Sequence, residues 1–136
     1  MKVVLDTNVL VSGIFFRGIP GRIVDAWIDD KIALFCTPSI MEEYARVIHE
    51  LSIYQDNLLS IEWIDNLIEL CHMIPDPPKT GSYSRDRHDD KFIFCAISAK
   101  ADYLVTGDKD LTSLYYQFPF LILSPNQFLS RLTKIK

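Results

Sequence analysis

The chain has 136 residues, of which 49% are hydrophobic and 24% are charged, and its formal net charge is −4. These values are typical of a folded globular protein and exclude an intrinsically disordered chain. The negative charge also argues against a protein that coats nucleic acid through a strongly basic surface. A chain of this length can bury one hydrophobic core, so we predict a single domain over residues 1–136.

The cysteines and the N-terminus indicate a cytoplasmic location. Cys36, Cys71 and Cys95 are odd in number and lack a C-x-x-C spacing, so neither a disulfide framework nor a thiolate zinc site is expected. The chain enters an apolar strand pattern directly, without the charged and apolar regions of a signal peptide. No apolar run reaches the ~18 residues needed to cross a bilayer, so no membrane partner is expected.

The first half of the chain alternates apolar runs with helical patterns. We predict a strand over 3–6, a helix over 7–16 and a turn over 17–21. A helix over about 21–29 and a strand over 33–37 follow. Amphipathic helices are then predicted over 38–51 and 58–71, the first opened by Pro38.

The second half continues this alternation. Residues 74–82 hold three of the seven prolines and form at most a short edge strand followed by a loop. A helix over 89–99, a strand over 103–108, a helical turn over 110–115, a strand over 118–123 and a helix over 126–132 complete the pattern. The result is an α/β fold around a parallel sheet of four to five strands, one of them doubtful.

Two of these strands end on an aspartate. Asp6 and Asp108 each follow an apolar run rich in Val and Leu, which is typical of a strand buried on both faces of a parallel sheet. Open α/β sheets carry their chemistry at the carboxyl ends of such strands. Two neighbouring carboxylates repel unless a proton or a cation lies between them, and oxygen ligands favour Mg²⁺ or Mn²⁺. The strand ends therefore predict a metal site.

Helical geometry distinguishes the two glutamates of residues 38–51. At 100° per residue, Glu43 borders the apolar stripe next to Val47, whereas Glu42 points away from the stripe with Arg46. We therefore expect Glu43 to face the sheet and Glu42 to be an exposed acid that pairs with Arg46.

The charged run before residue 91 supplies further acids. Asp86 and Asp89 are expected mainly to cap the helix that follows. Asp90 begins this helix, and its carboxylate can face the same sheet edge as Asp6, so it is a candidate metal ligand with capping as the alternative.

Short polar groups surround the predicted strand ends. Asp110 either caps the next short helix or supplies an outer carboxylate. Asn8 and Thr106, together with Thr7 and Ser12, either cap locally or orient the acids through hydrogen bonds.

Several other chemistries lack their motifs. The chain contains neither a G-x-G-x-x-G nor a G-x-x-x-x-G-K-[ST] loop, and it has no G-x-S-x-G elbow. Aspartyl phosphotransfer usually needs a second acid two residues after the nucleophile, a position that Asn8 occupies. None of the histidines is expected to be catalytic.

Four segments together resemble the PIN domain family, including the PIN proteins that are toxin components of toxin–antitoxin pairs. The segments are V-V-L-D-T-N-V-L-V over 3–11, the helix over 39–48 that carries Glu43, D-D-K-F-I-F-C-A over 89–96, and A-D-Y-L-V-T-G-D-K-D-L over 101–111. This resemblance implies a three-layer α/β/α sandwich, Mg²⁺- or Mn²⁺-dependent ribonuclease activity, dimerisation and inhibition by a cognate antitoxin. The family's four acids fall on Asp6, Glu43, Asp90 and Asp108, and its accessory polar positions on Asn8 and Thr106.

The leading hypothesis is therefore hydrolysis of RNA phosphodiester bonds by a cytoplasmic toxin whose four acids hold one or two divalent ions. The alternative is a PIN scaffold that binds RNA or protein with little turnover. Candidate contacts to RNA phosphates are basic side chains near the rim. They are Arg17, Arg22, Lys79, Arg85, Arg87 and Lys109.

Overall fold

The computed structural model describes residues 1–54, 59–76, 90–114 and 117–134. Within these residues, five short strands form one sheet in the order β3-β2-β1-β4-β5. The strands are β1 (Lys2–Leu5), β2 (Ala33–Cys36), β3 (His72–Met73), β4 (Tyr103–Val105) and β5 (Leu121–Leu123). Each adjacent pair runs parallel. The predicted α/β fold with a parallel sheet is confirmed.

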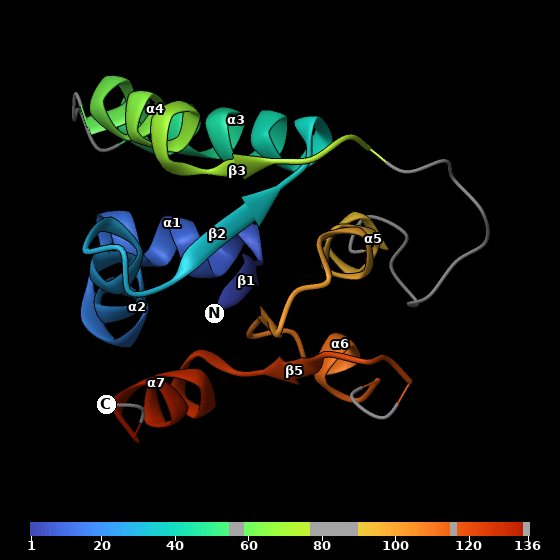
Figure 1. The fold of residues 1–136 in the computed structure, drawn as a ribbon. Coiled ribbons are helices and arrows are strands. Elements are labelled where there is room, and N and C mark those ends of the chain that lie inside the picture. The colour runs from blue at the N-terminus through green and yellow to red at the C-terminus, as the bar shows by residue number, and fades with distance from the viewer. Residues whose placement is uncertain (55–58, 77–89, 115–116, 135–136) are drawn as a thin grey trace.

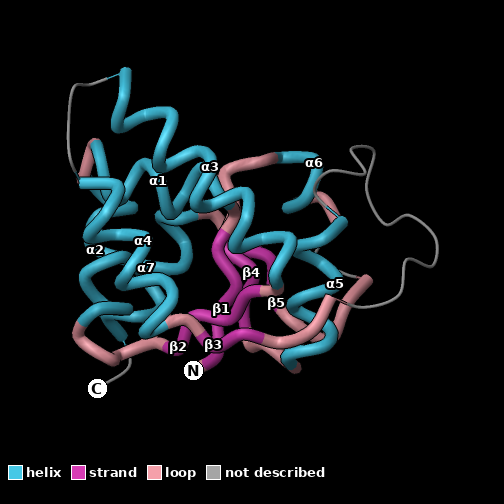
Figure 2. Tube along the Cα trace, turned by 90° about the horizontal axis from the view of Figure 1, so that it is seen from above, coloured by secondary structure: helices cyan, strands magenta, loops and turns pink. Residues whose placement is uncertain are grey.

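Helices cover both faces of this sheet. They are α1 (Thr7–Phe15), α2 (Gly18–Ile28), α3 (Pro38–Tyr54), α4 (Leu59–Leu70), α5 (Asp90–Ala99), α6 (Lys109–Thr112) and α7 (Pro125–Lys134). Figures 1 and 2 both place α1, α2 and α7 on one side of the strands and α5 on the other. Helices α3 and α4 pack against each other at the β3 end of the molecule. The architecture is the predicted three-layer α/β/α sandwich.

Strand β1 lies at the centre of the sheet. Its residues Val3, Val4 and Leu5 are each 0% exposed, as expected for a strand with helices over both faces. The hydroxyl of Tyr44, on α3, donates to the carbonyl oxygen of Leu5. Leu5 pairs with Val105 of β4, so the residues after these two leave the sheet side by side.

Helix α2 begins three residues earlier than predicted, at Gly18. The turn before it is short because Arg17 and Gly18 both adopt positive φ angles, 63° and 62°. Pro20 then lies in the first helical turn, where its missing N–H costs no hydrogen bond.

The two strands next to prolines are shorter or earlier than predicted. The doubtful strand is β3, which pairs through His72 and Met73, and the N–H of Ile74 still donates to the carbonyl oxygen of Cys36. Residues 77–82 of the predicted segment lie outside the described residues. Strand β3 ends before Pro75, which has no N–H to donate to a neighbouring strand. Strand β5 begins at Leu121 and not at residue 118, because Pro119 interrupts the pairing in the same way.

Cys36, Cys71 and Cys95 are free thiols. Cys36 and Cys95 are buried and Cys71 is partly exposed, with 2.7 Å between the Sγ atoms of Cys36 and Cys71. Burial raises the pKa of Cys95 to about 12. Among the described residues, no helix has the length and apolar character needed to cross a membrane.

Candidate active site

The strand order places two acids at one point of the sheet. From β1 the chain builds β2 and β3 on one side, and it then returns to add β4 and β5 on the other. Parallel sheets bind ligands at such a reversal, outside the carboxyl ends of the strands. Asp6 directly follows β1 and Asp108 follows β4 by three residues, so both lie at this point.

Asp6 is a buried carboxylate, 7% exposed. It is the N-cap residue of α1, but its side chain makes no capping hydrogen bond. Its Oδ2 accepts from the hydroxyl of Thr106, at 2.7 Å, and Thr106 is itself 0% exposed. This hydrogen bond holds the Asp6 carboxylate at the sheet edge.

The pKa of Asp6 is raised above its ordinary value, chiefly because burial disfavours the charged form. The Thr106 hydroxyl and the backbone N–H of Asn8 oppose this rise, and the negative charges of Glu43 and Asp108 add to it. Glu43 and Asp108 are therefore each close enough to Asp6 to repel its charge. The Asn8 side chain is exposed, so Asn8 acts on Asp6 through its backbone.

Glu43 lies on the buried face of α3 and is 6% exposed, whereas Glu42 is exposed, as helical geometry predicted. Thr7, at the start of α1, donates its hydroxyl to Glu43 Oε2. Lys91 Nζ lies 2.7 Å from Glu43 Oε1. The expected pair of Glu42 with Arg46 is wrong, because Arg46 instead lies 3.4 Å from Glu50, one turn further along the helix.

Asp90 is the first residue of α5 and is 4% exposed. Its neighbour Lys91 reaches Glu43, so the start of α5 and the buried face of α3 meet beside the other acids. A ligand role for Asp90 stays a prediction. Asp86 and Asp89 lie outside the described residues.

Asp108 is the N-cap residue of α6. Its Oδ1 accepts from the backbone N–H of Asp110 at 2.9 Å, and its own N–H donates to Thr106 Oγ1 at 3.0 Å. Asp108 therefore fills the capping role considered for Asp110, whose side chain is exposed. Thr106 connects Asp6 and Asp108 because its hydroxyl contacts both residues.

These acids fit a divalent cation in donor type, since carboxylate oxygens are the ligands that Mg²⁺ and Mn²⁺ prefer. Across residues 1–54, 59–76, 90–114 and 117–134, no three histidine, cysteine, aspartate or glutamate side chains form a group that could hold a metal ion. Glu43 Oε2 accepts from the Thr7 hydroxyl and Glu43 Oε1 is bound by Lys91, so both carboxylate oxygens already have protein partners.

Sequence analysis missed Lys91. Lys91 and Glu43 are 48 residues apart and belong to different helices, so no local spacing connects them. Thr7 was noted only as one of several short polar groups, and its contact with Glu43 depends on how α1 and α3 pack.

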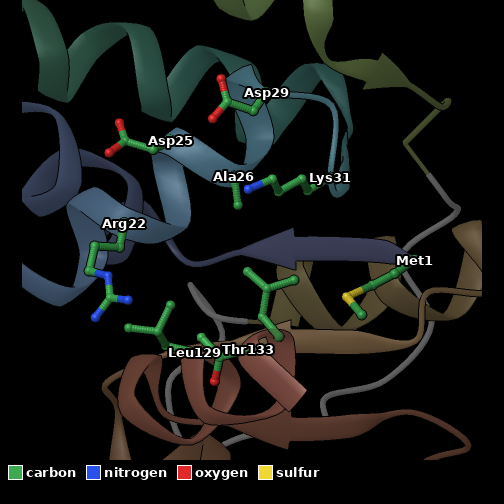
Figure 3. Close-up of a pocket in the computed structure, with 9 residues that line it drawn as sticks. Met1, Arg22, Asp25, Ala26, Asp29, Lys31, Leu129 and Thr133 are labelled. Atoms are coloured by element: carbon green, nitrogen blue, oxygen red, sulfur yellow. The ribbon is translucent and has the colours of Figure 1, made fainter. Parts of the chain in front are cut away.

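A separate hollow lies at the opposite end of β1. This pocket of about 750 Å³ is formed mainly by α2 and α7 (Figure 3). It is lined by Met1, Arg22, Asp25, Ala26, Asp29, Lys31, Leu129, Leu132 and Thr133. Met1 precedes β1 and Asp6 follows it, so the pocket is distinct from the acidic site. Its charged residues are of both signs, and Asp25 is paired with Arg17 at 2.6 Å.

The fold and these carboxylates define a parallel α/β protein with an acidic site at the point where strand order reverses. A family model described as "PIN domain" matches residues 2–110, and the chain belongs to the PIN domain family. PIN domains are typically nucleases, generally use divalent metal ions and are often toxins of the VapC type.

Similar proteins agree with this family and fold. The chain is 33% identical to the uncharacterised protein MJ1680 of Methanocaldococcus jannaschii, over 98% of this chain and 93% of that protein. The crystal structure of PAE2754 from Pyrobaculum aerophilum matches with a TM-score of 0.63 at 17% identity, over 98% of this chain and 96% of that one. VapBC2 from Rickettsia felis, bound to a DNA fragment from its promoter, matches with a TM-score of 0.57 at 15% identity, over 90% of this chain and 97% of that one. At these identities the two structures support the fold alone.

Proposed function

We propose that this protein is a divalent-metal-dependent ribonuclease that hydrolyses RNA phosphodiester bonds, and that it is the toxin of a toxin–antitoxin pair. The observation that carries the proposal is the position of Asp6 and Asp108 at the reversal point of the sheet, with Glu43 close enough to raise the pKa of Asp6. Carboxylates that repel one another across a strand end are suited to sharing a cation.

Asp6, Glu43, Asp90 and Asp108 are the residues that would hold Mg²⁺ or Mn²⁺. A bound divalent cation supplies Lewis-acid polarisation of the phosphate, which favours attack by water and departure of the leaving oxygen.

The neighbouring residues of this chain hold the acids in place. Thr106 orients Asp6 and accepts from the N–H of Asp108, while the N–H of Asp110 fixes Asp108 Oδ1. Mutation of such hydrogen-bond partners typically lowers metal affinity or activity by ~10- to 100-fold.

RNA contacts are proposed for basic side chains near these acids. Lys109 is exposed and directly follows Asp108, which suits a contact with an RNA phosphate. Arg17 is less suitable because Asp25 already binds its guanidinium, and Arg22 lines the pocket at the other end of β1. Lys79, Arg85 and Arg87 lie outside the described residues.

A cognate antitoxin and a second copy of the chain are the proposed protein partners, alongside the RNA substrate. Support for the antitoxin comes from family membership and from the likeness to VapBC2, whose complex was solved on promoter DNA. A cytoplasmic location is proposed together with this function.

The test is RNA cleavage in Mn²⁺ by wild type, Asp6→Asn, Glu43→Gln and the matched control Glu42→Gln, which changes the exposed neighbour of Glu43 on the same helix. We expect Asp6→Asn and Glu43→Gln to lose more than the ~100-fold that loss of an outer partner costs, and Glu42→Gln to cleave like wild type. Wild-type rates in all three variants would reject the assignment. Tight RNA binding without cleavage, equal in wild type and Asp6→Asn, would favour the alternative of a binding module.

A further inference from the structure

An ion pair lies inside the acidic site. Lys91, the second residue of α5, places Nζ 2.7 Å from Glu43 Oε1, and the side chains of Lys91 and Glu43 are only 22% and 7% exposed. The ammonium also lies 5.7 Å from the centroid of the Phe92 ring. Charge and packing together hold it against Glu43, away from bulk water.

The carboxylate that Lys91 binds, that of Glu43, is a candidate metal ligand. Thr7 donates to one oxygen of Glu43 and Lys91 to the other. A divalent cation that approaches Glu43 therefore meets a positive charge already bound there. The charge of Glu43 also acts on Asp6, whose pKa it helps to raise, so an ammonium bound to Glu43 offsets charge at the acidic site.

We propose that Lys91 is a tethered counter-ion of this site, whose ammonium competes with a divalent cation for Glu43. Lys91 thereby offsets part of the charge of the buried acids when the site binds no metal, and it lowers the affinity of the site for metal. The inference rests on the proposed function only in that the site takes a divalent cation.

A role as an RNA contact is the competing explanation for Lys91. An ammonium that binds phosphate is expected at an exposed rim, whereas this one is mostly buried and already paired with a carboxylate. The geometry therefore favours a role toward Glu43.

The experiment is a calorimetric titration of Mn²⁺ into RNA-free protein. It compares wild type with Lys91→Met, which removes the charge, and Lys91→Arg, which keeps it. Lys100→Met is the matched control, because Lys100 is an exposed lysine that directly follows the same helix, at the end opposite Lys91.

Removing a unit positive charge beside a divalent cation should strengthen Mn²⁺ binding by on the order of tenfold. We expect that decrease in Kd for Lys91→Met, and values close to wild type for Lys91→Arg and Lys100→Met. In EDTA, Lys91→Met should also have a lower Tm than Lys100→Met, because it removes the ammonium that pairs with the buried Glu43.

An unchanged or weaker Mn²⁺ affinity in Lys91→Met overturns the proposal, as does a higher KM for RNA with no change in the Kd for Mn²⁺. Poor folding of Lys91→Met would not prevent the test, since Lys91→Gln removes the same charge with a polar side chain. The titration contains no RNA. If Lys91→Met binds Mn²⁺ more tightly but the wild type cleaves no RNA, only the ribonuclease proposal is rejected. If the wild type cleaves RNA but Lys91→Met binds Mn²⁺ with unaltered affinity, only the counter-ion proposal is rejected.

Discussion

The buried position of the Asp6 carboxylate destabilises the folded protein and favours the binding of a ligand there. Its carboxylate is buried, and the two like charges of Glu43 and Asp108 act on it. The Thr106 hydrogen bond offsets only part of this cost, since the pKa of Asp6 stays raised. Strain of this kind is typical of functional sites.

A first prediction concerns Asp6→Asn in EDTA. Because folding raises the pKa of Asp6 above its ordinary value of 3.8, the protonated side chain is favoured in the folded state. That contribution to stability is present at low pH and is lost as the pH rises through the folded-state pKa. Neutral Asn should therefore raise the free energy of unfolding at pH 7, with a smaller gain at pH 4.

Thermal unfolding of wild type and Asp6→Asn at the two pH values, followed by circular dichroism, measures this difference. A destabilised Asp6→Asn at pH 7, or a gain that does not depend on pH, would contradict the argument.

The acids of the candidate site and the orienting residue Thr106 could be found from the sequence, whereas Lys91 could not. Asp6 and Asp108 follow strands, which apolar runs reveal, and Glu43 follows from the helical angle. Lys91 reaches Glu43 only because α5 and α3 converge, and no local pattern encodes that convergence.

At the level of elements, α1 and α2 approach each other closely at Gly13. A Cβ atom there would lie 2.5 Å from Val24 Cγ2 and 2.6 Å from the backbone oxygen of Pro20. Since a backbone atom cannot move aside cheaply, we expect Gly13→Ala to destabilise the protein by about 1–3 kcal/mol.

Gly107 provides the control for Gly13. A Cβ at Gly107 would meet no atom within 4 Å, so Gly107→Ala should change stability by less than ~0.5 kcal/mol. Urea unfolding of both variants gives the comparison, and equal effects would show that the α1–α2 contact is not the cause.

At the end of α5, by contrast, a substitution is expected to stabilise the protein. Lys100 has a φ of 52°, and the N–H groups of Lys100 and Ala101 donate to the carbonyls of Ile97 and Ala96. This is the Schellman pattern, in which glycine usually takes the left-handed position. Lys100→Gly should therefore stabilise the protein by about 0.5–1 kcal/mol. Lys100→Ala keeps the Cβ and should bring no such gain, which chemical denaturation of the two variants can test.

The type of nearly every described element could be predicted, and several boundaries could not. Buried strands leave continuous apolar runs, and helices leave a period of 3.6 residues. The ends of β3 and β5 depend on which backbone N–H groups a proline removes, and the start of α2 depends on two positive φ angles that composition alone does not reveal.

Across the whole molecule, strand order gathers acids that are far apart along the chain. Asp6 and Asp108 are brought together because β1 and β4 are neighbours, although most of the chain lies between them. Local patterns place each acid at the end of its own element, and topology decides which ends meet.

Because the acids proposed to bind a cation come together only in the folded chain, the stability of the whole protein should depend on metal. A cation that binds only the folded protein stabilises it by about 2.7 kcal/mol at a concentration 100 times its Kd. We expect the Tm of wild type to rise with Mn²⁺ relative to EDTA, and that of Asp6→Asn to rise less. Calorimetric scans across a Mn²⁺ series measure both, and a Tm independent of Mn²⁺ in wild type would exclude a site that binds the ion in the folded state.

The shortness of β3 limits how two copies of the chain can meet. This edge strand offers two residues for pairing, His72 and Met73, and Pro75 follows almost at once. A neighbouring chain could add too few main-chain hydrogen bonds here to extend the sheet from one subunit into another. The fold is therefore protected on this side from edge-to-edge aggregation, and self-association by sheet extension is disfavoured at β3.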